Sequence, residues 1–172
     1  LAASGANFGF RASLPHIIGV SAGFISLVIA AGFRLASLFA TLPHLYDFMK
    51  IISFMFLVYV AWRIAGAGRT KTQSPNEPLR FWQAAMFQLV NPKGVSVIIS
   101  SVTAYTSSAT AVASEVFVLF VVFSFVTVGS TITWTLFGLV IGQVLNTPKR
   151  LRMFNITTAS LLLISLIPVI IT

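Results

Sequence analysis

The sequence predicts an all-α integral membrane protein, and three observations support this prediction. Hydrophobic residues make up 57% of the chain and charged residues only 8%, whereas a soluble domain carries about 25% charged residues. Apolar stretches that reach the roughly 20 residues needed to cross a bilayer recur along the chain. The basic residues behind the net charge of +8 fall between these stretches rather than along one face with aromatic residues, so no nucleic-acid partner is predicted.

Five transmembrane spans are predicted in this chain. Residues 1–11, LAASGANFGFR, end in a turn and resemble the tail of a helix that begins earlier, so six spans are expected in the complete protein. The first full span covers about 16–41, and the second covers about 45–65. The first contains Gly19 and Gly23, a small-residue pair that is predicted to pack closely against another helix.

One hydrophilic linker divides what is predicted to be a single membrane domain, 1–172. Residues 66–80, GAGRTKTQSPNEPLR, carry glycines, prolines and charges that interrupt every periodic pattern. We expect this linker to separate an N-terminal half, 1–65, whose first helix is mostly missing, from a C-terminal half, 81–172.

The C-terminal half opens with the most informative stretch, 81–105. It is long and apolar enough to cross a bilayer, yet Asn91, Pro92, Lys93 and Gly94 lie in its middle. Proline disrupts a helix interior but suits the first helical position, and asparagine is a good residue to cap a helix start. The stretch is therefore predicted to be one discontinuous helix with its break inside the membrane.

Lys93 is the reason to predict a substrate site at this break. It lies 12 residues into the stretch, about 18 Å from its start at 1.5 Å per residue, where a lysine costs about 2.5–3.5 kcal/mol. Discontinuous helices mark substrate sites in transporters, because free amides at the second half-helix attract anions. The predicted substrate-binding residues are Lys93, Asn91, Pro92, Gly94 and Gln88.

The same residues could have structural roles instead of binding a substrate, and the sequence leaves both interpretations open. Asn91 serves equally well as a plain helix cap, and Gln88 as a polar contact between helices. Lys93 would then be a structural residue whose ammonium group is satisfied by carbonyls.

Two further spans complete the chain. A polar loop near 106–115 precedes an uncharged span at about 116–141, and a basic turn precedes the last span at about 153–172. Gly138 and Gly142 form a second small-residue pair that is predicted to pack against another helix.

The basic residues also predict the orientation. If the five spans alternate, eight Lys or Arg residues fall on one side and two on the other, with Lys93 inside the membrane. Since cytoplasmic loops carry the excess of positive charge, the linker and the 143–152 turn are predicted to be cytoplasmic. The eight are Arg11, Arg63, Arg69, Lys71, Arg80, Lys149, Arg150 and Arg152.

Three segments resemble the lysine/threonine exporter family, LysE/RhtB. Residues 3–11, ASGANFGFR, followed by LPH at 14–16, are similar to the segment after the first helix of that family. Residues 57–62, LVYVAW, resemble the end of its third helix, and 81–105, with QLVNPK inside it, resembles its fourth. Over the last two spans only hydropathy and length agree.

The resemblance implies a multi-pass exporter of amino acids or close derivatives in the bacterial inner membrane, driven by the proton gradient. It further implies two inverted three-helix repeats with a midplane site between the halves. The family's first helix carries a Pro-Gly-Pro-type motif, which this chain lacks. The implied partners are the lipid bilayer and a small amino acid such as cysteine, O-acetylserine, homoserine or threonine. A homo-oligomer is left open.

Two other classes of protein compete with an exporter. An enzyme is not predicted, because the chain has no cysteine and only two histidines, His16 and His44, placed on opposite membrane faces; no cofactor or metal site is predicted either. The alternative function is a degenerate or non-transporting membrane scaffold subunit, in which Lys93 would tolerate a neutral replacement.

Overall fold

The computed structural model describes residues 1–32, 42–67, 77–105, 112–145 and 147–165, and all regular structure within these ranges is helical. This confirms the predicted all-α class. The helices are α1 (Ala2–Gly32), α3 (Pro43–Gly66), α4 (Phe81–Val90), α5 (Pro92–Tyr105), α6 (Val112–Val144) and α7 (Pro148–Ile164).

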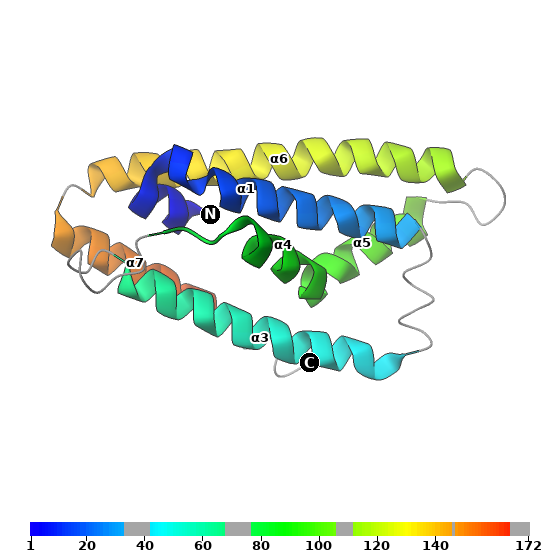
Figure 1. Cartoon of the computed structure of the whole chain (residues 1–172), viewed down its shortest axis with the longest axis horizontal. Coiled ribbons are helices and arrows are strands. Elements are labelled where there is room, and N and C mark those ends of the chain that lie inside the picture. Colours follow the sequence, from blue (N-terminus) through cyan, green and yellow to red (C-terminus); the bar gives the residue numbers. More distant parts are fainter. Residues whose placement is uncertain (33–41, 68–76, 106–111, 146, 166–172) are drawn as a thin grey trace.

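The broken helix lies between two pairs of helices (Figure 1). α1 packs along α6, α3 packs along α7, and α1 also contacts both α4 and α5. An apolar core joins α1, α3, α5 and α6, so α5 is held from several sides. Its buried members are Leu27, Val28, Ala31, Met49, Val95, Ile98 and Leu119.

Three described helices are each long and apolar enough to cross a bilayer alone. The candidate membrane spans in these helices are Ala2–Gly32, Asp47–Gly66 and Ala113–Val144. The two halves of the broken helix have 10 and 14 residues, which is too short for a span by either half alone. The described α7 has 17 residues, the lower limit for a span, and it is not among the three. The other two of the five predicted spans therefore stay predictions, as do the inverted repeats.

The start of α1 corrects the prediction for residues 1–11. Instead of ending in a turn, this segment is helical from Ala2 and is interrupted at a single residue, Gly9, after which the helix continues to Gly32. Gly9 has φ 77° and ψ 174°, a conformation that is open essentially to glycine alone. The predicted span 16–41 therefore starts too late, and its residues 33–41 lie outside the described part of the chain.

Two later helices also begin earlier than predicted. α6 starts at Val112, inside the predicted polar loop, and places Glu115 in its first turn, where a negative charge is favourable. α7 starts at Pro148, inside the predicted basic turn. The side-chain oxygen of Thr147 accepts a hydrogen bond from the Arg150 backbone N–H at 3.4 Å, which caps this helix.

The predicted linker is described only at its ends. α3 continues to Gly66 and is followed by a turn at Ala67, and residues 77–80 precede α4 without regular structure. Residues 68–76 lie outside the described ranges. The division of the domain into two halves stays a prediction.

Glycines of α1 let α4 approach closely. A Cβ atom added at Gly19 would clash with the Phe81 carbonyl, and one added at Gly23 would clash with the Ala85 backbone. Ala84 and Ala85 of α4 are themselves buried. Small residues on both helices therefore bring the two backbones into contact.

A second pair of glycines does the same between α6 and the start of α1. A Cβ at Gly138 would clash with the carbonyl of Ala2, and one at Gly142 would clash with the backbone of Ala6. The short segment before Gly9 is thereby held against α6.

Candidate functional site

A break in the helical backbone at Asn91 separates α4 from α5. Asn91 has φ −76° and ψ 105°, which is extended rather than helical, and Pro92 is the first residue of α5. The Asn91 side-chain oxygen Oδ1 accepts hydrogen bonds from the backbone N–H groups of Lys93, at 3.2 Å, and Gly94, at 3.4 Å. Asn91 thus caps α5, and the predicted break between two half-helices is confirmed. The place of this break inside the membrane stays a prediction.

This cap corrects one expectation about the site. From the sequence, the amides after Pro92 are expected to be free to face an anion, whereas those of Lys93 and Gly94 already donate to Asn91. The reason is local, because a short asparagine side chain competes for the same N–H groups that a bound anion would use. An anion can use these two amides only by sharing or displacing the Asn91 cap.

A serine of α3 satisfies a carbonyl group that the break leaves free. In a continuous helix the Val90 carbonyl would accept a hydrogen bond from the Gly94 N–H, which here bonds to Asn91. Instead, the hydroxyl of Ser53 donates to the Val90 oxygen, and Ser53 is buried. This bond ties α3 to the break and satisfies a backbone group that a bilayer could not hydrate.

The predicted site residues do not all face one space. Pro92 and Gly94 are buried, Asn91 is half-buried and Lys93 is exposed. Gln88 is buried and lines the larger of two cavities, whereas Lys93 lines neither of them. The structure therefore places Gln88 and Lys93 on different surfaces, one on each side of the break.

Lys93 belongs to a polar face of α5. Ser96, Ser100 and Thr103 are exposed on the same helix as Lys93, and their spacing of three or four residues aligns them along one side. We name these four residues the α5 polar face. A face with one cation and three hydroxyls is ill-suited to lipid tails, which cannot form hydrogen bonds.

The larger cavity, of about 440 Å³, is lined by residues of α1, α3, α4, α6 and α7. Most of its lining is apolar, including the rings of Phe56 and Phe87, which stack with their centroids 4.6 Å apart. The polar side chains that line it are His16, Gln88 and Thr158. A cavity of this size, mostly apolar with a few polar groups, is typical of a small-molecule site.

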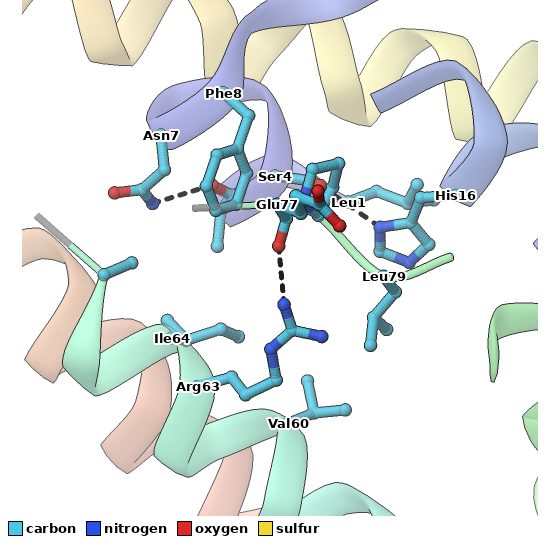
Figure 2. A pocket seen from close by; sticks show the side chains of 13 residues that line it. Leu1, Ser4, Asn7, Phe8, His16, Val60, Arg63, Ile64, Glu77 and Leu79 are labelled. Carbon is cyan, nitrogen blue, oxygen red and sulfur yellow. Dashed lines mark hydrogen bonds between the residues drawn. The ribbon is translucent and has the colours of Figure 1, made fainter. Parts of the chain in front are cut away.

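A smaller cavity, of about 70 Å³, shares lining residues with the larger one. Figure 2 shows the side chains that line the smaller cavity. Arg63 extends into it from α3, and its Nη2 donates to the Glu77 backbone oxygen at 2.6 Å. On the opposite wall, His16 Nδ1 lies 3.2 Å from the Ser4 hydroxyl. The residues shared by both cavities are Leu1, Ala3, His16, Val60, Ile64 and Leu79.

Half-buried Asn7 and buried Asn155 form a pair that the sequence does not predict. The Nδ2 of Asn7 donates to Oδ1 of Asn155, and Nδ2 of Asn155 donates to Oδ1 of Asn7, both at 2.7 Å. Asn155 also donates to the Ala67 carbonyl at 3.0 Å and has no exposed surface. This pair joins the first segment of α1 to α7 and to the end of α3. The only sequence signal is an isolated Asn at each position.

Comparisons with known proteins place the chain in a family. The family model described as LysE type translocator matches residues 1–166. The chain is 26% identical over 138 residues to the cysteine/O-acetylserine efflux proteins of Escherichia coli strain K12 and of Shigella flexneri serotype 5b strain 8401, which covers 78% of this chain and 69% of each relative. No solved structure matches the chain. On the match over nearly its whole length, the chain belongs to the LysE type translocator family.

Proposed function

We propose that this protein exports small neutral amino acids, of the cysteine and O-acetylserine class, across the bacterial inner membrane. The observation that carries the proposal is the helix break at Asn91, which puts Lys93 in the middle of an apolar stretch. Family membership supports it, and so do the relatives whose names describe cysteine/O-acetylserine efflux. The export would be driven by the proton gradient, and the halves 1–65 and 81–172 would move against each other about the 66–80 linker.

The α5 polar face is the proposed wall of the substrate path. Lys93 sits about 18 Å into the stretch that begins α4, so its ammonium group would meet the substrate carboxylate near the middle of the bilayer. The N-terminus of α5 adds a favourable partial positive charge. Asn91, Pro92 and Gly94 shape this helix start, and sharing of the Asn91 cap would let the substrate reach its amides.

Gln88 has a separate role in the proposal, because it faces the larger cavity rather than the α5 polar face. Its side-chain oxygen can accept a hydrogen bond from the substrate ammonium group. The cavity is lined from both halves of the chain, so relative movement of the halves would change its access. We propose that the substrate passes from this cavity to the Lys93 side of the break.

One observation favours the alternative, a scaffold subunit that does not transport. The amides of Lys93 and Gly94 already bond to the Asn91 cap, and Lys93 lines neither of the two cavities. Both features are expected of a helix break that has only a structural role. The two functions differ in what Lys93 must do. A scaffold would tolerate a neutral side chain there, and an exporter would not.

The test is efflux of radiolabelled L-cysteine, kept reduced, from proteoliposomes that contain the full chain. Lys93→Met should abolish export while insertion and detergent-solubilised size stay unchanged, and Lys93→Arg should retain part of it. Lys149→Met, which removes an exposed cation near the start of α7, is the matched control and should export normally. Export by Lys93→Met at the wild-type rate would refute the assigned role, and no export by the wild type would refute the function.

A further inference from the structure

Arg63 is a half-buried cation with no carboxylate partner in the described part of the chain. Its guanidinium donates to the Glu77 backbone oxygen at 2.6 Å and to the Tyr59 hydroxyl at 3.5 Å, and its central carbon lies 5.8 Å from the centre of the Tyr59 ring. The Glu77 carboxylate turns instead to Arg80, at 3.5 Å. Arg63 is therefore held in place by neutral groups.

This arrangement leaves the Arg63 guanidinium beside a cavity without an ion-pair partner in the described part of the chain. Glu77 also lines this cavity, but its carboxylate pairs with Arg80. A half-buried cation loses part of its hydration free energy, and an anion in contact with the cation restores part of that loss. Arginine presents a planar fork of N–H donors that matches a carboxylate with two parallel hydrogen bonds. The hydrogen bond to the Glu77 carbonyl holds this fork at the cavity shown in Figure 2. The Tyr59 ring also contacts the guanidinium.

We propose that Arg63 binds the α-carboxylate of the amino acid at the cytoplasmic mouth of the protein, before the substrate reaches the helix break. The assignment of this end to the cytoplasm and the substrate class rest on the proposed function. The site is distinct from Lys93, which lines neither cavity. The carboxylate would meet two cations in succession, first Arg63 and then Lys93.

The geometry of the cavities supports this order. The small cavity around Arg63 and the larger one around Gln88 share lining residues, His16 among them. A substrate whose carboxylate is on Arg63 would therefore extend its ammonium group toward the larger cavity, where Gln88 offers an acceptor. His16 lies at the junction, where it is held by Ser4.

The same site would select against basic amino acids. Most of the residues that line the cavity with Arg63 are apolar, Phe8, Val60 and Ile64 among them, and they suit a short neutral side chain. The other polar residues in this lining are Ser4, Asn7, His16 and Glu77. A second positive charge on the substrate would meet Arg63 without a carboxylate to balance it, because Glu77 is engaged by Arg80. We therefore expect L-lysine to compete poorly with L-cysteine.

The experiment measures binding and transport with two probes, L-cysteine and L-cysteinamide, which lacks the carboxylate. Binding is followed by calorimetry on the full chain in detergent, and transport by uptake into proteoliposomes in the cytoplasm-to-outside direction. Arg63→Gln should weaken binding of cysteine and raise its KM at least tenfold, as expected for a lost charged hydrogen-bond pair. It should change the cysteinamide values less than about threefold, because that ligand never uses the carboxylate contact.

Two variants separate this effect from a general loss of positive charge or of folding. Arg152→Gln removes an exposed arginine on the same predicted side of the membrane. Arg152 lines neither cavity, so this variant should leave both probes unchanged. Arg63→Lys keeps the charge without the planar fork and should fall between wild type and Arg63→Gln.

The outcomes distinguish this inference from the proposed function. If the wild type binds cysteine but transports none, export is refuted, and selective loss of cysteine binding in Arg63→Gln still supports the carboxylate site. If transport occurs and Arg63→Gln leaves the cysteine KM unchanged, or weakens both probes equally, the Arg63 site is refuted and export stands. Absence of cysteine binding to the wild type also overturns the Arg63 site.

Discussion

Replacing the asparagine pair should reveal a strong coupling between the two ends of the chain. Asn7 and Asn155 exchange two hydrogen bonds of 2.7 Å across 148 residues of sequence, and Asn155 has no exposed surface. Asn155→Ala also removes the bond to the Ala67 carbonyl. It leaves the Asn7 side-chain oxygen without its partner, whereas Nδ2 of Asn7 keeps its bond to the Ala3 carbonyl.

The magnitude follows from these bonds. An unsatisfied buried polar group costs about 1–3 kcal/mol, so Asn155→Ala should lower the free energy of unfolding by about 2–3 kcal/mol. Hydrogen bonds between membrane helices give coupling energies that average about 0.6 and reach about 1.7 kcal/mol. For two reciprocal bonds we expect the Asn7–Asn155 coupling to be about 1–2 kcal/mol.

The assay is a double-mutant cycle, read by reversible unfolding in mixed detergent micelles. It compares Asn7→Ala, Asn155→Ala and the double variant, since the cycle isolates the pair from the Ala67 bond. Thr157→Ala, at an exposed position of α7, is the control and should change stability by less than about 0.5 kcal/mol. Additive losses, with a coupling near zero, would refute the pairing.

Three further predictions concern the backbone. Gly138→Ala should destabilise the protein by more than about 2 kcal/mol, because the new methyl group meets the Ala2 carbonyl. Gly129→Ala adds a methyl group with no atom within 4 Å, so it should be neutral or stabilise the protein by up to about 1 kcal/mol. Equal effects of the two variants in thermal unfolding would argue against the close contact at Gly138. Gly9→Ala should lower the free energy of unfolding by about 1–3 kcal/mol. The cause is the positive φ at this position, since the added methyl group has no atom within 4 Å. An unchanged melting temperature would contradict the kink at Gly9. Asn91→Ala should lower the free energy of unfolding by about 0.5–2 kcal/mol, whereas Asn91→Asp should retain most of the stability, because aspartate also caps a helix. An equal loss of stability in both variants would show that Asn91 does not stabilise the protein through its cap.

The features that the sequence predicts correctly depend on neighbouring residues. Asn91 and Pro92 define the start of α5 by local rules of capping and backbone geometry, and the structure follows them. The helix start of α6 is missed because small polar residues near Glu115 are typical of loops, yet they can also form a first helical turn. The kink at Gly9 is missed for a related reason, because a single glycine can interrupt a helix without ending it.

What the sequence does not predict depends on residues distant in the chain. Nothing near Asn155 indicates that it pairs with Asn7. Ser53 looks like an ordinary polar residue in a span until α3 is placed beside the Val90 carbonyl. Arg63 is accounted for by the charge bias of cytoplasmic loops, and only the folded chain brings it next to a cavity without a carboxylate partner among the described residues.

Thiol labelling on the α5 polar face tests the central proposal most directly. The chain has no cysteine, so a single introduced thiol gives an unambiguous signal. Ser100→Cys and Phe125→Cys both place the thiol at an exposed position, the first on the α5 polar face and the second on apolar α6. If the α5 polar face lines a water-filled substrate path, a membrane-impermeant thiol reagent applied to native membranes will modify the cysteine at position 100 and spare the one at 125. Equal resistance of both thiols would mean that the α5 polar face does not line an aqueous path, and would contradict the proposed route.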